Sequence, residues 1–280
     1  MAVVIDGRAV ADTVYNKLTE RIDILARKNV RPGLAVVLVG DDPASRIYVN
    51  MKKRACERFG LRSEEHKLEA KVSQCELLNL IKRLNADSAI HGILVQLPLP
   101  SGFNAGEVIN AIEPRKDVDG LHPLNIGKLL IGDAAFIPCT PAGIIKLIEH
   151  TGLPMAGKQA VVVGRSNMVG KPAAILLLRE NATVTICHSK TANLPEVCRQ
   201  ADILVAAVGK PEIITGDMVK PGAVVIDVGT NKVGDRQVGD VNFDQVQKVA
   251  GYITPVPRGV GPMTIAMLMS NTVKAAERSL

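Results

Sequence analysis

The chain has 280 residues, which is room for one large or two medium domains, and its 47% hydrophobic and 22% charged residues are ordinary for a soluble globular protein. Aromatic residues make up only 2%, with no Trp, which argues against a nucleic-acid surface built on base stacking. The net charge of +6 comes without a Lys/Arg block, so it suits an anionic small molecule better than a DNA-binding stripe.

Cysteine and histidine usage gives no sign of a metal or disulfide framework. The five cysteines are scattered without a CxxC pair, and their odd number favours a reducing compartment. No apolar run approaches the roughly 18 residues that cross a bilayer. The first residues lack the basic and long apolar regions of a secretion signal. We therefore expect a cytoplasmic protein without a metal centre.

The predicted elements of the first half alternate between strands and helices. Residues 3–5 form a short expected strand, and a helix follows from about Gly7, with apolar side chains every three or four residues. Residues 33–39 are apolar throughout, which predicts a strand buried on both faces. Asp42 is then a candidate N-cap for a helix that begins at Pro43 and runs to about residue 59. Further helices are expected at 77–84, 107–112 and 125–130, and a strand at 90–95.

Polar groups stand at three places among these elements. Tyr48 and Lys52 are four residues apart on the predicted helix, so they share one face, although such a pair is most often an ordinary amphipathic contact. Gln96 follows the strand at 90–95, at the end where ligands bind in open α/β sheets. Asp117 and Asp119 lie in a turn-rich loop, where the alternative interpretation is turn capping.

The sequence at 139–141 predicts a joint between two domains, 1–139 and 140–261. Thr140 is the expected N-cap, and Pro141 the first-turn proline, of a helix to about residue 150. Beyond it, strands expected at 160–163, 183–187, 203–208 and 223–228 alternate with helices, which predicts a doubly wound parallel sheet. A Pro/Gly-rich connection then leads to a helix that starts near Pro262, and we expect residues 262–280 to pack back on the first domain.

The segment 159–172 predicts a phosphate-binding corner. An apolar strand runs into Gly164, and Ser166 and Gly170 continue a small-residue turn before a helix, whose free N–H groups attract anions. The dinucleotide fingerprint has a glycine where Ser166 stands, and its last glycine comes one residue earlier, so a plain strand-to-helix turn stays an alternative. A P-loop is excluded because Pro172, not Ser or Thr, follows Lys171.

The end of the next strand favours NADP over NAD. An NAD-binding unit carries an acid about 20 residues after the glycine turn, to bind the ribose hydroxyls. Ser189 and Lys190 stand there instead, and Arg165 lies in the first turn. These groups could hold a 2′-phosphate, which a carboxylate would repel. The alternative is that they form a solvated loop.

Several stretches together carry a resemblance to one family. They are YVNMK (48–52), VQLPLP (95–100), KDVDG (116–120), PCTP (138–141), VVVGRSNMVGKP (161–172), HSKT (188–191), DVGTN (227–231) and TPVPRGVGPMT (254–264). In their order and spacing, the chain resembles the bifunctional methylenetetrahydrofolate dehydrogenase/methenyltetrahydrofolate cyclohydrolase family over essentially all its length. The resemblance implies an α/β protein with an N-terminal folate-binding catalytic domain and a doubly wound, Rossmann-like NADP-binding domain.

The resemblance also implies a reaction and a place for it. NADP-dependent oxidation of 5,10-methylenetetrahydrofolate gives the 5,10-methenyl compound, which is hydrolysed to 10-formyltetrahydrofolate. The expected setting is a cytoplasmic homodimer in tetrahydrofolate interconversion that serves purine, methionine and histidine biosynthesis, with no nucleic-acid or membrane partner. Two other functions stay open: a two-domain NADP dehydrogenase for a small carboxylic acid, and a nucleotide-sensing or structural module without chemistry.

The resemblance assigns roles to individual residues. Lys52 would shuttle protons and orient the attacking water, and Gln96 would hydrogen-bond Lys52. Tyr48 would stack on the aminobenzoate ring, and Asp119, rather than Asp117, would bind the pterin. The positions expected to contact the dinucleotide are Gly164, Arg165, Ser166, Ser189 and Thr230. No metal is required, because hydride transfer is the chemistry of the cofactor.

Overall fold

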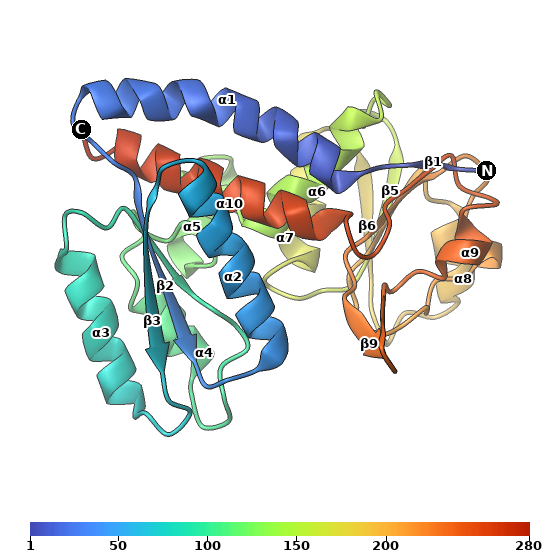
Figure 1. Cartoon of the computed structure of the whole chain (residues 1–280). Helices are drawn as coiled ribbons and strands as arrows, with labels where there is room; N and C mark the ends of the chain where they lie inside the picture. Colours follow the sequence, from blue (N-terminus) through green and yellow to red (C-terminus); the bar gives the residue numbers. More distant parts are fainter. The chain divides into compact units, whose positions relative to one another are not determined.

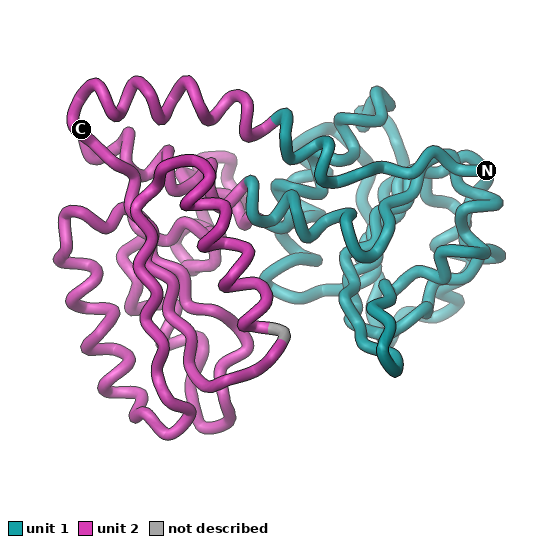
Figure 2. The backbone as a smooth tube through the Cα atoms, in the orientation of Figure 1, with its two compact units in different colours: residues 1–13, 140–266 teal, residues 14–139, 267–280 magenta. Residues whose placement is uncertain are grey.

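The computed structural model describes residues 1–43 and 45–280. The chain divides into two compact units, coloured separately in Figure 2. Unit 1 comprises residues 1–13 and 140–266, and unit 2 comprises residues 14–139 and 267–280. Each unit therefore contains two separate stretches of the chain. Among the described residues, no helix combines the length and the apolar character needed to cross a membrane.

Unit 2 contains a three-stranded parallel sheet. Its order is β3 (Arg62–Leu68), β2 (Gly33–Val39) and β4 (Gly92–Val95), with β2 fully buried as its apolar sequence predicts. Figure 1 shows α2 (Pro43–Arg58) and α3 (Gln74–Ala86) on opposite sides of this sheet. Asp42 is confirmed as the N-cap of α2, because its side chain accepts the Ser45 N–H at 2.8 Å.

Further helices complete unit 2. They are α4 (Ala105–Asn110), α5 (Pro123–Ile131), and the parts of α1 (Gly7–Arg27) and α10 (Val260–Glu277) that lie within its residue ranges. Arg21 on α1 donates two hydrogen bonds to Glu277 on α10, at 2.8 and 2.7 Å. Asn271 on α10 donates to the carbonyls of Val118 and Ile137. The end of α10 therefore packs on the same unit as β2 and α2, as predicted.

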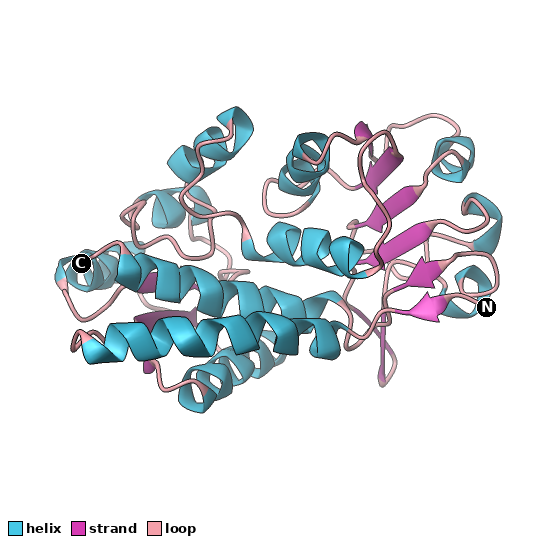
Figure 3. Cartoon of the chain, turned by 90° about the horizontal axis from the view of Figure 1, so that it is seen from above, coloured by secondary structure: helices cyan, strands magenta, loops and turns pink.

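Unit 1 contains a six-stranded sheet in which every pairing is parallel, in the order β1-β11-β8-β7-β5-β6. Figure 3 shows helices on both sides of these strands. The strands are β1 (Val3–Val4), β5 (Gln159–Val163), β6 (Thr183–Cys187), β7 (Ile203–Ala206), β8 (Val224–Asp227) and β11 (Tyr252–Ile253). The other elements are α6 (Cys139–His150), α7 (Gly170–Arg179), α8 (Leu194–Arg199), α9 (Phe243–Val246), a short 3₁₀ helix (Gly216–Met218), and the hairpin of β9 (Asn231–Val233) and β10 (Arg236–Val238). The predicted doubly wound parallel sheet is confirmed.

Local predictions differ from the structure at several points. Thr140 is not an N-cap, because α6 already begins at Cys139, and the Thr140 hydroxyl instead shares a 2.9 Å hydrogen bond with the hydroxyl of Thr264. The strands expected at 203–208 and 223–228 end two and one residues early, since the turns that follow leave the sheet. Strand β3 was not predicted, because its charged sequence RSEEHKL carries no apolar run; it lies at a sheet edge, where charged side chains are common.

Candidate active site

Lys52 and Gln96 meet in unit 2. Lys52 projects from the middle of α2 and is only 7% exposed, while Gln96 directly follows β4. The Lys52 ammonium donates a 2.7 Å hydrogen bond to Gln96 Oε1, and Gln96 Nε2 donates to the Leu97 carbonyl at 2.7 Å. The second bond fixes the side-chain amide with its oxygen toward Lys52. The structure therefore brings together the two residues that the sequence placed on separate elements.

The surroundings of Lys52 favour its neutral form. Burial lowers the pKa of Lys52, and the negative charge of Asp119 acts against that shift. Burial also raises the pKa of Asp119, and the Lys52 charge acts against it. The pKa values of a base and an acid are thus moved toward each other. Such a pair is suited to exchanging protons, as acid–base catalysis requires.

Asp117 and Asp119 have different environments, although they are two residues apart. The Asp117 side chain is 2% exposed and accepts the N–H groups of Leu121 at 3.1 Å and His122 at 2.8 Å, together with the Asn125 amide at 2.7 Å. Its oxygens therefore cap a turn. Across the described residues, no backbone N–H donates to the Asp119 carboxylate, and Asp119 keeps part of its surface exposed. Unlike Asp117, Asp119 does not cap the turn, and its side chain interacts with Lys52 and with the Cys139 thiol.

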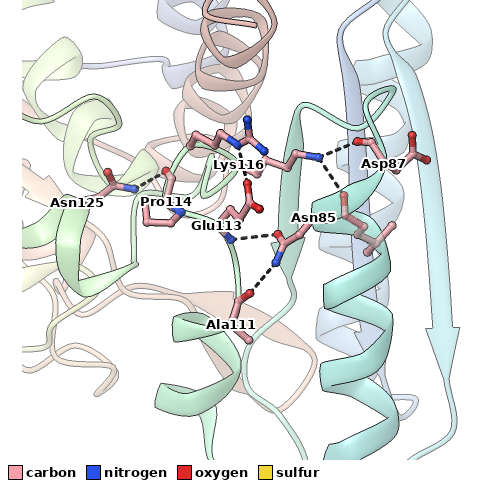
Figure 4. Close-up of polar contacts among 9 residues, drawn as sticks. Asn85, Asp87, Ala111, Glu113, Pro114, Lys116 and Asn125 are labelled. Carbon is pink, nitrogen blue, oxygen red and sulfur yellow. Dashed lines mark hydrogen bonds and ion pairs between the residues drawn. The ribbon is translucent and has the colours of Figure 1, made fainter.

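The loop that carries Asp119 is attached to α3 (Figure 4). Lys116 is 7% exposed, and its ammonium donates to the carbonyls of Leu84 at 3.0 Å and Asp87 at 2.7 Å, at the C-terminal end of the helix. Carbonyls at a helix end lack partners within the helix and are stabilised by a cation. Burial lowers the pKa of Lys116. Lys116 therefore joins the loop to the helix three residues before Asp119.

Asn85 and Asn125 hold the same loop at further points. Asn85 accepts the Glu113 N–H at 3.0 Å and donates to the Ala111 carbonyl at 2.7 Å, and Asn125 donates to the Pro114 carbonyl at 3.0 Å (Figure 4). The sequence analysis missed Lys116, Asn85 and Asn125. The position of Lys116 within the KDVDG motif was the available signal, whereas nothing local distinguishes the two asparagines from surface residues.

Tyr48 and Cys139 complete the surroundings of Lys52. Tyr48 lies one turn before Lys52 on α2 and is half-buried. Cys139 is 1% exposed, and its thiol donates to the Val118 carbonyl at 3.3 Å. Burial and the Asp119 charge raise the pKa of the Cys139 thiol well above its usual value. The thiol is therefore held protonated beside the Lys52–Asp119 pair, a neighbour that the sequence analysis did not single out.

The structure of the glycine turn in unit 1, at residues 164–170, explains why its sequence differs from the dinucleotide fingerprint. Gly164 has φ +130°, and a Cβ there would lie 2.1 Å from the Ala207 carbonyl oxygen. A Cβ on Gly170 would lie 2.2 Å from the Gly164 carbonyl oxygen, so the late glycine lets the start of α7 approach the turn. Ser166 Oγ accepts the N–H groups of Val169 at 3.1 Å and Gly170 at 3.3 Å. The serine side chain therefore holds the turn that leads into α7, at the position where the fingerprint has a glycine.

The side chains expected at the dinucleotide follow neighbouring strands. Arg165 follows β5, Ser189 and Lys190 follow β6, and Thr230 follows β8; all four side chains are exposed. Because β6, β5, β7 and β8 are adjacent and parallel, their C-terminal ends share one sheet edge, where ligands bind in such folds.

The same turn has N–H groups available for a phosphate. Within residues 1–43 and 45–280, the amides of Ser166 and Asn167 donate to no protein group. Free amides, a close-approach glycine and an exposed Arg165 fit a phosphorylated dinucleotide. Those residues contain no cluster of three or more His, Cys, Asp or Glu side chains that could hold a metal ion.

Comparisons with known proteins show the family to which both parts of the chain belong. Residues 5–119 match the catalytic domain of tetrahydrofolate dehydrogenase/cyclohydrolase, and residues 138–280 match its NAD(P)-binding domain. The bifunctional protein FolD of Moorella thermoacetica is 59% identical over 278 residues, which are 99% of each chain.

Solved structures give the same result. The bifunctional enzyme FolD of Campylobacter jejuni, a methylenetetrahydrofolate dehydrogenase/cyclohydrolase, has a TM-score of 0.97 and 46% identity over 100% of both chains. The corresponding Trypanosoma brucei enzyme, solved with NADP and an inhibitor, has a TM-score of 0.95 and 43% identity over 99% of this chain and 98% of that chain. The chain therefore belongs to the tetrahydrofolate dehydrogenase/cyclohydrolase family.

Proposed function

We propose that this protein is a bifunctional one-carbon folate enzyme. It oxidises 5,10-methylenetetrahydrofolate to the 5,10-methenyl compound with NADP and then hydrolyses that product to 10-formyltetrahydrofolate. The observation that carries the proposal is the buried Lys52–Gln96 pair beside Asp119, in a chain that matches both domains of the family. The two alternatives, a small-acid dehydrogenase and a module without chemistry, lose their support once the family is established.

Lys52 has the chemistry that the hydrolytic step needs. The methenyl carbon is bonded to two nitrogens and carries positive charge, so water attacks it and must lose a proton as the C–O bond forms. A neutral Lys52 amine can accept that proton and return it to the ring nitrogen whose bond to the carbon breaks. The remaining hydroxyl proton is lost to solvent as the formyl C=O bond forms. The hydrogen bond that Lys52 donates to Gln96 Oε1 keeps the amine in position. A nearby cationic substrate would lower the pKa of Lys52 further.

Asp119 and Tyr48 are proposed to bind the folate. The Asp119 carboxylate can accept two parallel N–H bonds from the aminopyrimidine edge of the pterin. Its attachment through Lys116 to α3 would hold it in register for that contact. Tyr48 supplies an aromatic face one helical turn from Lys52, suited to stacking on the aminobenzoate ring.

The glycine turn and its neighbours are proposed to bind NADP. The cofactor supplies the hydride acceptor, and the protein holds it. Gly164 would let the dinucleotide approach the backbone closely, and the free amides of Ser166 and Asn167 could bind one of its phosphates. Arg165 and Ser189 are suited to binding the 2′-phosphate. Thr230 is assigned to the same edge. Unit 2 would form the folate-binding domain and unit 1 the NADP-binding domain. The domains expected from the sequence, 1–139 with 262–280 and 140–261, differ from these units at residues 1–13 and 262–266, which lie in unit 1.

We further propose a cytoplasmic homodimer without nucleic-acid partners, which supplies formyl and methylene groups for purine, methionine and histidine biosynthesis. One surface supports the dimer. Strand β6 lies at the edge of its sheet. Two apolar side chains near this edge are exposed: Ile186 on β6 to 42% and Leu178 on α7 to 60%. An unpaired edge with exposed apolar side chains is suited to a second copy of the chain.

A spectroscopic assay tests the function directly. The purified protein is mixed with methylenetetrahydrofolate and either NADP or NAD, and the reduced nicotinamide, the methenyl compound and the formyl product are each followed over time. We expect turnover with NADP and accumulation of 10-formyltetrahydrofolate. Absence of turnover with both dinucleotides would contradict the proposal, and accumulation of the methenyl compound alone would contradict the hydrolytic half.

A further inference from the structure

Two buried carboxylates in unit 1 take no part in the chemistry above. Asp227 ends β8 and is 4% exposed, and Asp240 follows β10 and is fully buried. Unpaired buried charges are costly, so carboxylates in such positions need several hydrogen-bond donors. Most of the donors that these two carboxylates use are backbone N–H groups, several of them in the loops at the expected dinucleotide edge.

Asp240 holds the loop after β7. Its carboxylate accepts three successive backbone N–H groups, from Val208 at 2.6 Å, Gly209 at 2.9 Å and Lys210 at 2.9 Å. Successive amides pointing at one anion form the kind of nest that binds phosphate, and here the anion belongs to the protein. The same carboxylate accepts the side-chain amide of Asn231 at 2.9 Å. Asp240 thereby links the loop after β7 to the segment after β8.

Asp227 holds the next segment and Asp240 itself. Its carboxylate accepts the N–H groups of Gly229 at 3.0 Å, Asp240 at 2.8 Å and Val241 at 3.0 Å. Its own N–H donates to the Thr254 hydroxyl at 2.7 Å. One acid therefore fixes the backbone on which the other stands, so the two act as one unit.

Two glycines beside the carboxylate pair have no space for a side chain. A Cβ on Gly239 would lie 1.7 Å from Asp227 Oδ2, and a Cβ on Gly229 would lie 2.2 Å from Asp240 Oδ1. Any side chain at either position would displace a carboxylate. The absence of side chains at these two positions is thus a condition for the carboxylate pair.

Thr230 stands between the two points of attachment. Gly229 before it is bonded to Asp227, and Asn231 after it is bonded to Asp240, while the Thr230 side chain itself is exposed. The loop at 208–210 follows β7, which pairs with β8, so both loops lie at the edge expected to bind the dinucleotide.

We propose that Asp227 and Asp240 are positioning residues for NADP binding, an inference that rests on the proposed function. They hold the loops at 208–210 and 229–231 in the binding arrangement before the cofactor arrives. Neither carboxylate is assigned a contact with NADP. If the loops were free, only the fraction of molecules with the correct arrangement would bind, and the apparent affinity would fall by that fraction.

The test is Asp240→Asn, measured by titration with NADPH and NADH fluorescence and by two activity assays. Asn replaces one acceptor oxygen by an NH₂ group that faces the loop amides, so we expect the Kd for both dinucleotides to rise by roughly tenfold or more. Hydrolysis of added methenyltetrahydrofolate, which needs no dinucleotide, should keep its wild-type rate. Asp235→Asn, an exposed acid between β9 and β10, is the matched control and should bind as the wild type does.

Two results would overturn the inference. One is a folded Asp240→Asn protein with wild-type affinity for both dinucleotides; the other is an equal loss of methenyl hydrolysis, which would indicate general destabilisation. If Asp240→Asn does not fold, Asn231→Ala, which removes a single bond to the same carboxylate, should raise both Kd values by a smaller factor, and an unchanged Kd would equally contradict the proposal. Failure of the wild type to bind NADPH would instead refute the proposed function.

Discussion

Charged side chains differ in burial and in proposed role between the surroundings of Lys52 in unit 2 and the loops near the glycine turn in unit 1. In unit 2 the proposed base Lys52 is buried, and burial moves its pKa and that of Asp119, proposed to bind the folate, toward each other. In unit 1 the groups proposed to bind the dinucleotide are exposed, and the buried charges of Asp227 and Asp240 lie beneath their loops. Acid–base chemistry requires altered pKa values, whereas anion binding requires amides and cations held in place.

Substitution of Lys52 is expected to have the largest effect. Lys52→Met keeps the length and apolar stem of the side chain but removes the base, so the rate of methenyl hydrolysis should fall by roughly 10² to 10⁴. NADPH affinity should stay unchanged, because it depends on unit 1. Lys53→Met, at an exposed neighbouring position on α2, is the control and should retain full activity. Measurable hydrolysis at the wild-type rate in Lys52→Met would remove the lysine from the mechanism.

The second prediction concerns the pH dependence of stability. Burial and the Asp240 charge raise the pKa of Asp227 to about 7, while its backbone hydrogen bonds act against the shift. The folded state then binds a proton more tightly than the unfolded state. The stability from this group is present below pH 4 and is lost as pH rises toward 7, by up to about 4 kcal/mol.

Urea unfolding of the wild type, Asp227→Asn and Asp235→Asn between pH 4.5 and 8 checks this slope. The neutral Asn cannot titrate, so Asp227→Asn should lack the fall in unfolding free energy that the other two proteins show. An identical slope in all three proteins would mean that Asp227 keeps its charge throughout, supported by its three N–H donors.

The sequence predicted what depends on regular patterns. Apolar runs located β2, β5 and β8, Asp42 was correctly placed as an N-cap, and the four-residue spacing put Tyr48 and Lys52 on one helix face. The pairing of Lys52 with Gln96 was expected only from the family resemblance, because the two residues are 44 positions apart in the sequence. Spacing alone contains no information on such a contact.

What the sequence did not predict depends on long-range contacts. Strand β1 falls within the strand expected at residues 3–5, but its partner β11 was not predicted, and no local pattern indicates that the two pair over nearly the whole chain length. Lys116 and Asp240 resemble surface charges until the carbonyls and amides around them are seen. The structural role of a buried charge depends on its partners, which are distant in sequence.

The third prediction tests how Asp119 is positioned. Lys116→Met removes the cation from the end of α3 and leaves the carbonyls of Leu84 and Asp87 without this donor, so the unfolding free energy should fall by about 1–3 kcal/mol. The KM for methylenetetrahydrofolate should rise while NADPH affinity stays constant. Lys82→Met, exposed on α3, is the control. A loss of stability without any change in KM would limit Lys116 to a structural role.

The smallest expected effect separates the two dinucleotides. Arg165 is exposed, and a charge-assisted bond to a 2′-phosphate is worth about 1.5–3 kcal/mol at most, less when solvent screens it. Arg165→Ala should therefore weaken NADPH by roughly tenfold and leave NADH nearly unchanged, whereas Asp240→Asn should weaken both. Arg179→Ala, at the far end of α7, is the control. An equal loss of affinity for both dinucleotides in Arg165→Ala would show that the arginine serves the loop, and the distinction between exposed binding groups and buried positioning groups in unit 1 would then fail.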